Sequence, residues 1–191
     1  MKGMKSYGNT CFLNSILQCL MYTPALAQIM VTHDAAALKG VAALRSRSEP
    51  AAVIELFCTG LKEYWSKPKR RKSVHTPLSM VENIRRVGKQ FQKYRQQDAH
   101  EYLVQLLDTM HEELLRANGL KLSDGKITET TAISRIFGGT FCNELRCSVC
   151  SYVSTTHNRF TDVSMEITNK VNSVEDAVKA FTKPETLGKG N

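Results

Sequence analysis

The sequence predicts an α+β fold in which helices occupy the first part of the chain and strands follow. Two observations predict it. Up to Gly119 the apolar residues recur at helical spacing, in segments that end near proline or glycine. Beyond Gly119 the chain is rich in β-branched and aromatic residues, and apolar side chains alternate at Val163, Met165 and Ile167. Helices first and strands later is the order of an α+β protein.

The composition is that of a globular protein. The 191 residues suit one domain or part of one, and 42% hydrophobic with 23% charged residues argues against disorder. No apolar run approaches a membrane span and no signal peptide precedes "YGNTC", so we expect an intracellular protein without a membrane partner. The six cysteines are then expected as reduced thiols, core residues or metal ligands: Cys11, Cys19, Cys58, Cys142, Cys147 and Cys150.

The net charge of +8 is local. Residues 62–95 carry a net charge of +9, which leaves the rest of the chain at −1. We interpret the densest part, Lys67 to Lys72, as a solvated loop, with a nuclear-import signal or an anion-binding patch as alternatives. Because aromatic residues are not interleaved with these cations, we do not expect a nucleic-acid partner.

The first helix is expected to hold Cys11 in its first turn and to end before Pro24, since proline disfavours helix for the residue before it. Asn9 or Thr10 can serve as its N-cap, which places Cys11 in the first turn. Its apolar stripe consists of Leu13, Ile16, Leu17 and Leu20.

A second helix is predicted from Pro50 to Trp65 with Cys58 in the core, and a short one ends near Gly88. The strongest periodicity follows, in residues 96–115. Asp98 and Glu101 form a plausible capping box for this helix. Its apolar stripe consists of Leu103, Leu106, Leu107, Met110 and Leu114.

The second part of the chain is predicted to hold strands between Ile133 and Ile167, with a CxxC turn between two of them. A short helix is expected to start after Ser173 and to end before Pro184.

Of the two cysteines in the first helix, position favours Cys11 as a nucleophile. The partly positive N-terminus of a helix lowers a thiol pKa, and the N–H groups of the first turn can hold a developing oxyanion. Cys19, two turns further on, gains little from this effect. A purely structural role for Cys11 stays open on placement alone.

Three pieces of the chain resemble the ubiquitin-specific proteases, in the order in which that family has them. "GMKSYGNTCFLNSILQCL" resembles the cysteine box, "YRQQDAHEYL" the following QQDAHEF box, and "FGGTFCNELRCSVC" to "FTDVSMEI" the start of the zinc-ribbon fingers. The resemblance implies a papain-like cysteine protease built as thumb, palm and fingers. It implies a hydrolase that removes ubiquitin from protein conjugates, with ubiquitin and ubiquitinated proteins as partners.

By this resemblance, residues 1–191 form an incomplete catalytic domain. Residues 1–130 correspond to the helical thumb and 131–191 to the start of the fingers, while the remainder of the palm is absent. Cys11 matches the nucleophile. Five residues earlier, Ser6 stands where the family usually has an oxyanion-binding Asn. Its hydroxyl offers one donor on a shorter arm, and losing one such donor typically costs about 100-fold to 1,000-fold in turnover.

The second box carries the residues that the resemblance assigns to substrate. Ubiquitin's tail has arginines before its two terminal glycines, so Asp98 and Glu101 can pair with them. Gln97 and His100 match positions near the active site. The capping role of Asp98 and Glu101 is compatible with this binding role, and for His100 a structural role stays open.

Cys147 and Cys150 supply half of a tetrahedral zinc site. The resemblance implies that both are ligands of a structural zinc and that a second CxxC lies beyond Asn191. We therefore expect zinc in the complete domain and weak binding at most by this chain alone.

A cysteine protease also needs a general base. In the resembled family that histidine lies downstream of the fingers, and the adjacent His33 and Asp34 are interpreted as a loop. We therefore expect residues 1–191 alone to be inactive. The alternatives are a non-catalytic ubiquitin-binding protein or truncated pseudo-enzyme, and a nucleic-acid adaptor.

Overall fold

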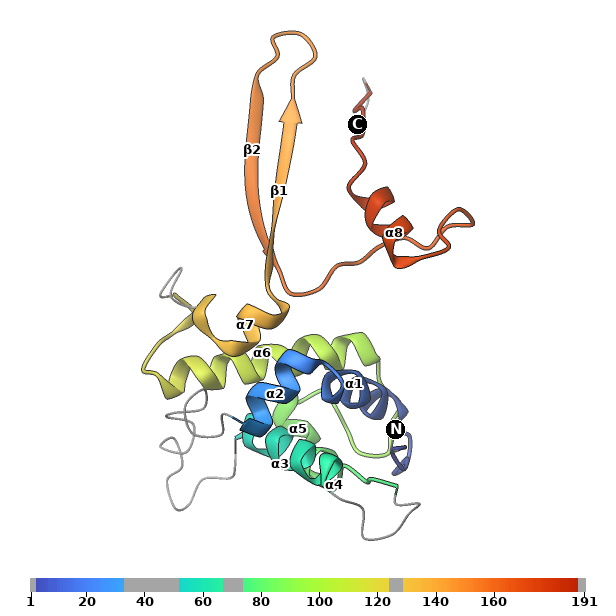
Figure 1. The fold of residues 1–191 in the computed structure, drawn as a ribbon, viewed down its shortest axis with the longest axis vertical. Helices are drawn as coiled ribbons and strands as arrows, with labels where there is room; N and C mark the ends of the chain where they lie inside the picture. Colours follow the sequence, from blue (N-terminus) through green and yellow to red (C-terminus); the bar gives the residue numbers. More distant parts are fainter. Residues whose placement is uncertain (1–2, 33–51, 67–73, 124–128, 189–191) are drawn as a thin grey trace. The chain divides into compact units, whose positions relative to one another are not determined.

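The computed structural model describes residues 3–32, 52–66, 74–123 and 129–188, and it confirms the predicted α+β fold. The predicted loops at Lys67 to Lys72 and at His33–Asp34 lie outside these residues. Two compact units divide the chain, Met1–Thr161 and Asp162–Asn191. The elements (Figure 1) are α1 (Cys11–Met21), α2 (Pro24–Thr32), α3 (Val53–Trp65), α4 (Leu78–Glu82), α5 (Ile84–Val87), α6 (Ala99–Ala117), α7 (Ala132–Phe137), β1 (Gly139–Arg146), β2 (Val153–Phe160) and α8 (Val174–Phe181).

The hydrophobic core of the first unit lies between its helices. α1 packs on α6 and α2, and α3 packs on α2, α4 and α6. The predicted apolar stripes face this core, and Cys58 is buried in it as expected. Only Leu103 and Ile16 of the stripes are half-buried. Side chains without exposed surface include Leu13, Leu17, Phe57, Leu61, Leu106 and Met110. The core therefore holds α1 against α2 and α6.

The start of α3 is held by a carboxylate from α6. The N-cap residue Ala52 has no side-chain acceptor, and the two oxygens of Glu113 accept from the backbone N–H groups of Val53 and Ile54, each at 2.9 Å. Glu113 is buried, and the positive end of a helix dipole stabilises such a carboxylate. The expected start at Pro50 lies outside the described residues, whose helix begins at Val53.

The strands form one antiparallel hairpin. Gly139 pairs with Phe160 at its base and Arg146 with Val153 at its far end, next to the CxxC turn. The ring of Phe160 covers Gly139 and stacks on Phe141 with centroids 4.1 Å apart. Most other side chains of the hairpin are exposed on both faces.

The prediction that the first helix ends before Pro24 is confirmed, since α1 ends at Met21. Pro24 itself opens α2, a helix that the sequence analysis did not predict; proline at the first helical position loses no hydrogen bond. Two other local predictions were wrong. The strand expected from Ile133 begins with α7, whose first turn is capped by Thr131 Oγ1 accepting from Ser134 N–H at 3.1 Å. Residues 163–167 alternate but form no strand, since no strand of the described residues pairs with them.

The second unit contains α8. It begins after Ser173, as predicted, and the Ser173 hydroxyl caps it by accepting from Asp176 N–H at 3.1 Å. It ends at Phe181, before Pro184. Within the described parts of both units, no helix combines the length and the apolarity that crossing a membrane requires.

Candidate functional site

The chain before Cys11 forms a tight loop, residues 6–10, which we call the cysteine loop. Gly8 and Asn9 both have left-handed backbone conformations, with φ of 60° and 54°. Thr10 is the N-cap of α1, as one of the two predicted candidates. Its hydroxyl accepts from Tyr7 N–H at 2.9 Å and so closes the loop. Cys11 consequently becomes the first residue of α1, where the predicted nucleophile was expected.

Two further contacts hold the segment before the cysteine loop. Asn14 Nδ2 donates to Lys5 O at 3.2 Å, and backbone N–H groups of Lys5 and His75 donate to His75 O and Gly3 O at 2.9 and 3.1 Å. Ser6, the first residue of the cysteine loop, is exposed. The segment before it is held by these contacts, and the loop after it is closed by the Thr10 hydroxyl. Asn14 thus helps to fix the path of the segment before the cysteine loop.

Beneath the loop lies an aromatic cluster that joins α1 to α6. The ring of Phe12 meets that of Tyr102 edge-on at 5.6 Å and that of Phe91 at 6.4 Å, while Phe91 and Tyr102 are 5.3 Å apart. All three side chains are buried. Phe12 follows Cys11 directly. The burial of its ring holds the start of α1 against the core, while the Cys11 thiol stays exposed at the surface.

The environment of Cys11 suits a nucleophile. Its side chain is exposed, and it stands at the N-terminus of an 11-residue helix, whose partial positive charge favours a thiolate. Cys19, eight residues further on the same helix, is also exposed but lies away from that end. Exposure therefore does not separate the two thiols, whereas their position along the helix does.

The second box begins α6 and lies next to the cysteine loop in space. Asn9 Nδ2 donates to Tyr94 O at 3.0 Å, which joins residues 85 positions apart in sequence. Asp98 caps α6 by accepting from Glu101 N–H at 2.8 Å, as predicted. The Glu101 carboxylate accepts from Gln90 Nε2 at 3.3 Å, so the Asp98 contact supplies one half of the predicted capping box.

The predicted substrate residues of this box are available at the surface. Asp98, His100 and Glu101 are exposed, and Gln97 is half-buried. The two carboxylates stand at the N-terminal end of α6, three residues apart. The structure thus joins both boxes through Asn9 and the backbone of Tyr94, a link that the sequence motifs alone did not identify.

The predicted zinc ligands lie in the turn between β1 and β2. Cys147 N–H donates to Tyr152 O at 2.8 Å and Ser151 N–H to Cys147 O at 3.0 Å, and Ser151 has a φ of 59°. Backbone N–H groups of Cys150 and Val149 that point at the sulfur lower the pKa of the Cys147 thiol. Such N–H contacts to sulfur suit a metal-bound thiolate, so this turn fits two of four ligands. The described residues contain no cluster of three or more candidate ligands.

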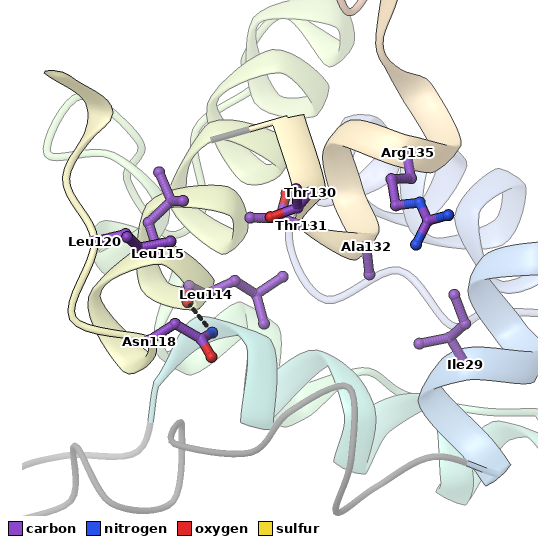
Figure 2. A pocket seen from close by; sticks show the side chains of 9 residues that line it. All are labelled: Ile29, Leu114, Leu115, Asn118, Leu120, Thr130, Thr131, Ala132 and Arg135. Atoms are coloured by element: carbon purple, nitrogen blue, oxygen red, sulfur yellow. Dashed lines mark hydrogen bonds between the residues drawn. The ribbon is translucent and has the colours of Figure 1, made fainter. Parts of the chain in front are cut away.

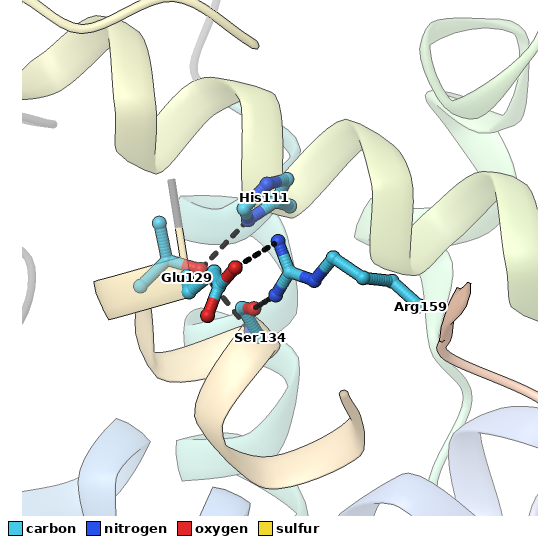
Figure 3. A network of polar contacts seen from close by, with 5 residues as sticks. His111, Glu129, Ser134 and Arg159 are labelled. Atoms are coloured by element: carbon cyan, nitrogen blue, oxygen red, sulfur yellow. Dashed lines mark hydrogen bonds and ion pairs between the residues drawn. The ribbon is translucent and has the colours of Figure 1, made fainter. Parts of the chain in front are cut away.

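A polar network joins the base of the hairpin to α6 and α7 (Figure 3). Arg159 of β2 pairs with Glu129 at 3.2 Å and donates to Ser134 Oγ at 3.2 Å, while His111 Nδ1 and Thr131 Oγ1 lie 2.7 Å apart. Burial lowers the pKa of His111, and Arg159 acts in the same direction. This histidine therefore belongs to the joint between hairpin and helices.

A cavity of about 460 Å³ lies between α2, the end of α6 and α7 (Figure 2). It contains one charged side chain and no thiol, and Asn118 Nδ2 within it donates to Leu114 O at 2.8 Å. None of the predicted site residues lines it. The lining residues are Ile29, Leu114, Leu115, Asn118, Leu120, Thr130, Thr131, Ala132 and Arg135.

Comparisons with known proteins agree with this arrangement. The family model described as ubiquitin carboxyl-terminal hydrolase matches residues 2–184. The chain is 33% identical over 98% of its length to ubiquitin carboxyl-terminal hydrolase 23 of Arabidopsis thaliana. It is 33% identical over 97% to ubiquitin carboxyl-terminal hydrolase 42 of Homo sapiens. These matches span 20% and 13% of the two relatives, so the chain is much shorter than either.

A solved structure shares the fold. The SAGA Ubp8/Sgf11/Sus1/Sgf73 DUB module bound to ubiquitin aldehyde matches 100% of this chain with a TM-score of 0.76 and 21% identity, over 40% of the matched chain. At this identity the likeness concerns the fold. It supports the arrangement of helices followed by a hairpin that the sequence predicted.

Proposed function

The chain belongs to the ubiquitin carboxyl-terminal hydrolase family, and from that premise we propose that it carries the nucleophile of a thiol-dependent deubiquitinase. The observation that supports this most strongly is the placement of Cys11. It is exposed at the first residue of α1, on a loop fastened to the start of α6. No other described cysteine is both exposed and the first residue of a helix that packs in the core.

In the proposed reaction the Cys11 thiolate attacks the carbonyl carbon of ubiquitin's C-terminal glycine. The S–C bond forms as the carbonyl becomes an oxyanion, and N–H groups at the start of α1 and the Ser6 hydroxyl are proposed to stabilise it. Collapse breaks the C–N bond, and the amine leaves with a proton from the base. Water then hydrolyses the thioester and restores the thiol.

Four histidines lie in the described residues, and none of them is proposed as the general base. His111 lies in the network at the hairpin base and His157 pairs with Cys142 in the hairpin. His75 bonds through its backbone to Gly3 and Lys5, and the family resemblance implies a base downstream of the hairpin rather than His75 or His100. We therefore propose that turnover depends on a histidine elsewhere in the protein, and that residues 1–191 alone hydrolyse conjugates slowly or not at all.

The substrate side of the site is proposed to be the start of α6. The exposed carboxylates of Asp98 and Glu101 offer bidentate partners for the arginines of ubiquitin's tail. Gln97 and His100 flank them and are proposed to contact the same tail. The N-cap bond of Asp98 fixes its carboxylate, so binding costs little additional ordering.

We also propose that Cys147 and Cys150 are ligands of a structural zinc, completed by two ligands outside the described residues. When bound, zinc would hold the far end of the hairpin together and would take no part in the chemistry. The exposed thiols of these residues and the free state of all six cysteines suit a reducing, intracellular location.

Hydrolysis of a fluorogenic ubiquitin conjugate by the full-length protein tests this function. We expect Cys11→Ala to abolish turnover and the matched Cys19→Ala, on the same helix, to leave it within about twofold of wild type. Equal loss in both variants would contradict the assignment. If the wild type binds ubiquitin without hydrolysing the conjugate, a non-catalytic ubiquitin-binding role replaces the enzymatic one.

A further inference from the structure

We propose that Tyr94 is a positioning residue for the reaction at Cys11, which it serves by clamping the cysteine loop. This inference rests on the proposed function and names a residue that neither catalysis nor substrate binding has used so far. Tyr94 lies in the segment that joins α5 to α6, four residues before Asp98. Three separate contacts connect it to three consecutive residues of the loop, Tyr7, Gly8 and Asn9.

The first contact is between the Tyr94 ring and Gly8. A Cβ atom added to Gly8 would lie 2.5 Å from Cδ1 of Tyr94, so the ring lies directly against the glycine backbone. Gly8 also has a φ of 60°, which side chains rarely tolerate. Both the conformation and the close approach therefore require glycine here, three residues before the nucleophile.

The second contact uses the backbone. The Tyr94 carbonyl accepts from Asn9 Nδ2 at 3.0 Å. Asn9 and Tyr94 both have left-handed conformations, with φ of 54° and 65°. For a bulky residue such as tyrosine this conformation is an unfavourable outlier. The surrounding contacts hold Tyr94 in a strained conformation that aims its carbonyl at the loop.

The third contact is between two phenols. Tyr7 and Tyr94 have ring centroids 6.0 Å apart at an interplanar angle of 38°, and a side-chain hydrogen bond with Tyr7 raises the pKa of Tyr94. Tyr7 N–H in turn donates to Thr10 Oγ1, the N-cap of α1. The contacts thus form a continuous path from Tyr94 to the residue before Cys11.

The exposure of Tyr7 and Tyr94 indicates that their contacts position the loop more than they stabilise the fold. Tyr94 and Tyr7 are 59% and 42% exposed, so their contacts bury little apolar surface and contribute little to folding. The buried packing below α1 is supplied instead by Phe12 and its neighbours. What Tyr94 does determine is the path of the loop between Ser6 and Cys11, relative to the start of α6.

The test compares Tyr94→Gly, Tyr94→Phe and the control Gln92→Ala in the full-length protein. Glycine keeps the left-handed backbone and the carbonyl, so the variant loses only the ring. Phenylalanine keeps the ring and loses the hydroxyl. Gln92 is an exposed neighbour two residues away in the same segment. The readouts are kcat and KM on a ubiquitin conjugate and the rate of amide hydrogen exchange in residues 6–12.

We expect Tyr94→Gly to lower kcat about 10-fold to 100-fold with KM within about twofold, since small misplacements of a nucleophile have effects of this size. Exchange in residues 6–12 should accelerate, while exchange in α3 stays unchanged. Tyr94→Phe should retain kcat within about threefold, and Gln92→Ala should match wild type.

Two results would overturn the inference: an unchanged kcat in Tyr94→Gly, or unchanged exchange in residues 6–12. An equal loss of kcat in Gln92→Ala would also overturn it. A wild-type protein that turns over no ubiquitin conjugate contradicts the proposed function instead. In that case the exchange rates alone decide whether Tyr94 clamps the loop, because they do not depend on catalysis.

Discussion

The helical region and the hairpin of the first unit both expose cysteines, yet they support them in opposite ways. Cys11 begins α1, and the next residue, Phe12, is buried in an aromatic cluster. Cys147 and Cys150 lie in a turn at the far end of two strands whose side chains are mostly exposed on both faces. The first thiol is positioned by a core, whereas the other two depend on backbone hydrogen bonds within their own turn.

This difference bears on what each region needs for its role. A nucleophile requires a fixed position, which the packed helices supply without any ligand. A two-stranded hairpin is marginal by itself, so its end gains order from a metal or from further strands. The following predictions alter one contact at a time, and they should affect the helical region strongly and the hairpin weakly.

The largest effect is expected from Glu113→Ala in α6. The substitution leaves the buried N–H groups of Val53 and Ile54 without their acceptors, so the free energy of unfolding should fall by about 3 kcal/mol. Urea unfolding measures it. The matched control is Glu112→Ala, which removes an exposed carboxylate from the neighbouring position and should change stability by less than about 0.5 kcal/mol. Equal effects would show that Glu113 does not cap α3.

The second prediction is a pair of Tyr→Phe substitutions with opposite outcomes. Tyr64 Oη accepts from Gln18 Nε2 at 2.7 Å and donates to Tyr22 Oη at 3.2 Å, so Tyr64→Phe should destabilise the protein by about 1 kcal/mol. The buried Tyr102 hydroxyl has no hydrogen-bond partner within the described structure, so Tyr102→Phe should be neutral or stabilising by up to about 1 kcal/mol.

Thermal unfolding of both variants measures the pair. A loss of stability in Tyr102→Phe equal to that in Tyr64→Phe would contradict the account, because it would reveal a partner for the buried hydroxyl. Burial also raises the pKa of Tyr102 well above its ordinary value, which keeps the hydroxyl protonated at all physiological pH values.

Features that depend on residues close together in the sequence were predicted, whereas features that depend on distant residues were not. The place of Cys11 in the first turn of α1, the cap by Asp98 and the start of α8 after Ser173 depend on neighbouring residues, so local patterns identified them. The cap of α3 by Glu113 and the contact of Asn9 with Tyr94 join residues 60 and 85 positions apart. No local pattern contains such information.

The errors have the same origin. Residues 163–167 alternate as a strand does, but a strand also needs a neighbour, and alternation alone does not supply one. The end of α1 before Pro24 was predicted correctly, but the helix that Pro24 opens, α2, was missed, because the pattern showed only that proline ends the preceding helix. For the site, recognition of the two boxes named the residues, while their mutual attachment through Tyr94 required the fold.

At the base of the hairpin, Arg159→Ala should have a small effect. Its partners Glu129 and Ser134 are both at 3.2 Å, but the ion pair is about half exposed, so solvent screens it and the loss should be about 0.5 kcal/mol or less. Chemical denaturation measures this, with Arg146→Ala at the other end of the hairpin as control. A loss above about 1.5 kcal/mol would mean that the hairpin contributes to the core more than its exposure indicates.

The smallest effect is expected from His111 and concerns pH. Burial lowers its pKa from the ordinary value of 6.5, so below about pH 6.5 the unfolded chain binds a proton that the folded chain does not. Stability from the neutral form is present above that pH and is lost as pH falls toward the lowered folded pKa. Wild type should therefore lose more stability than His111→Asn between about pH 7.5 and 5.5. Parallel pH profiles would exclude this assignment.

The central claim is that the core positions one thiol among six for reaction with ubiquitin. It is tested most directly by treating the full-length protein with ubiquitin bearing a C-terminal electrophile and mapping the modified cysteine by mass spectrometry. The account predicts an adduct on Cys11 and none on Cys19, which shares its helix and its exposure. An adduct on Cys19, or on Cys147 or Cys150 of the hairpin, would contradict it.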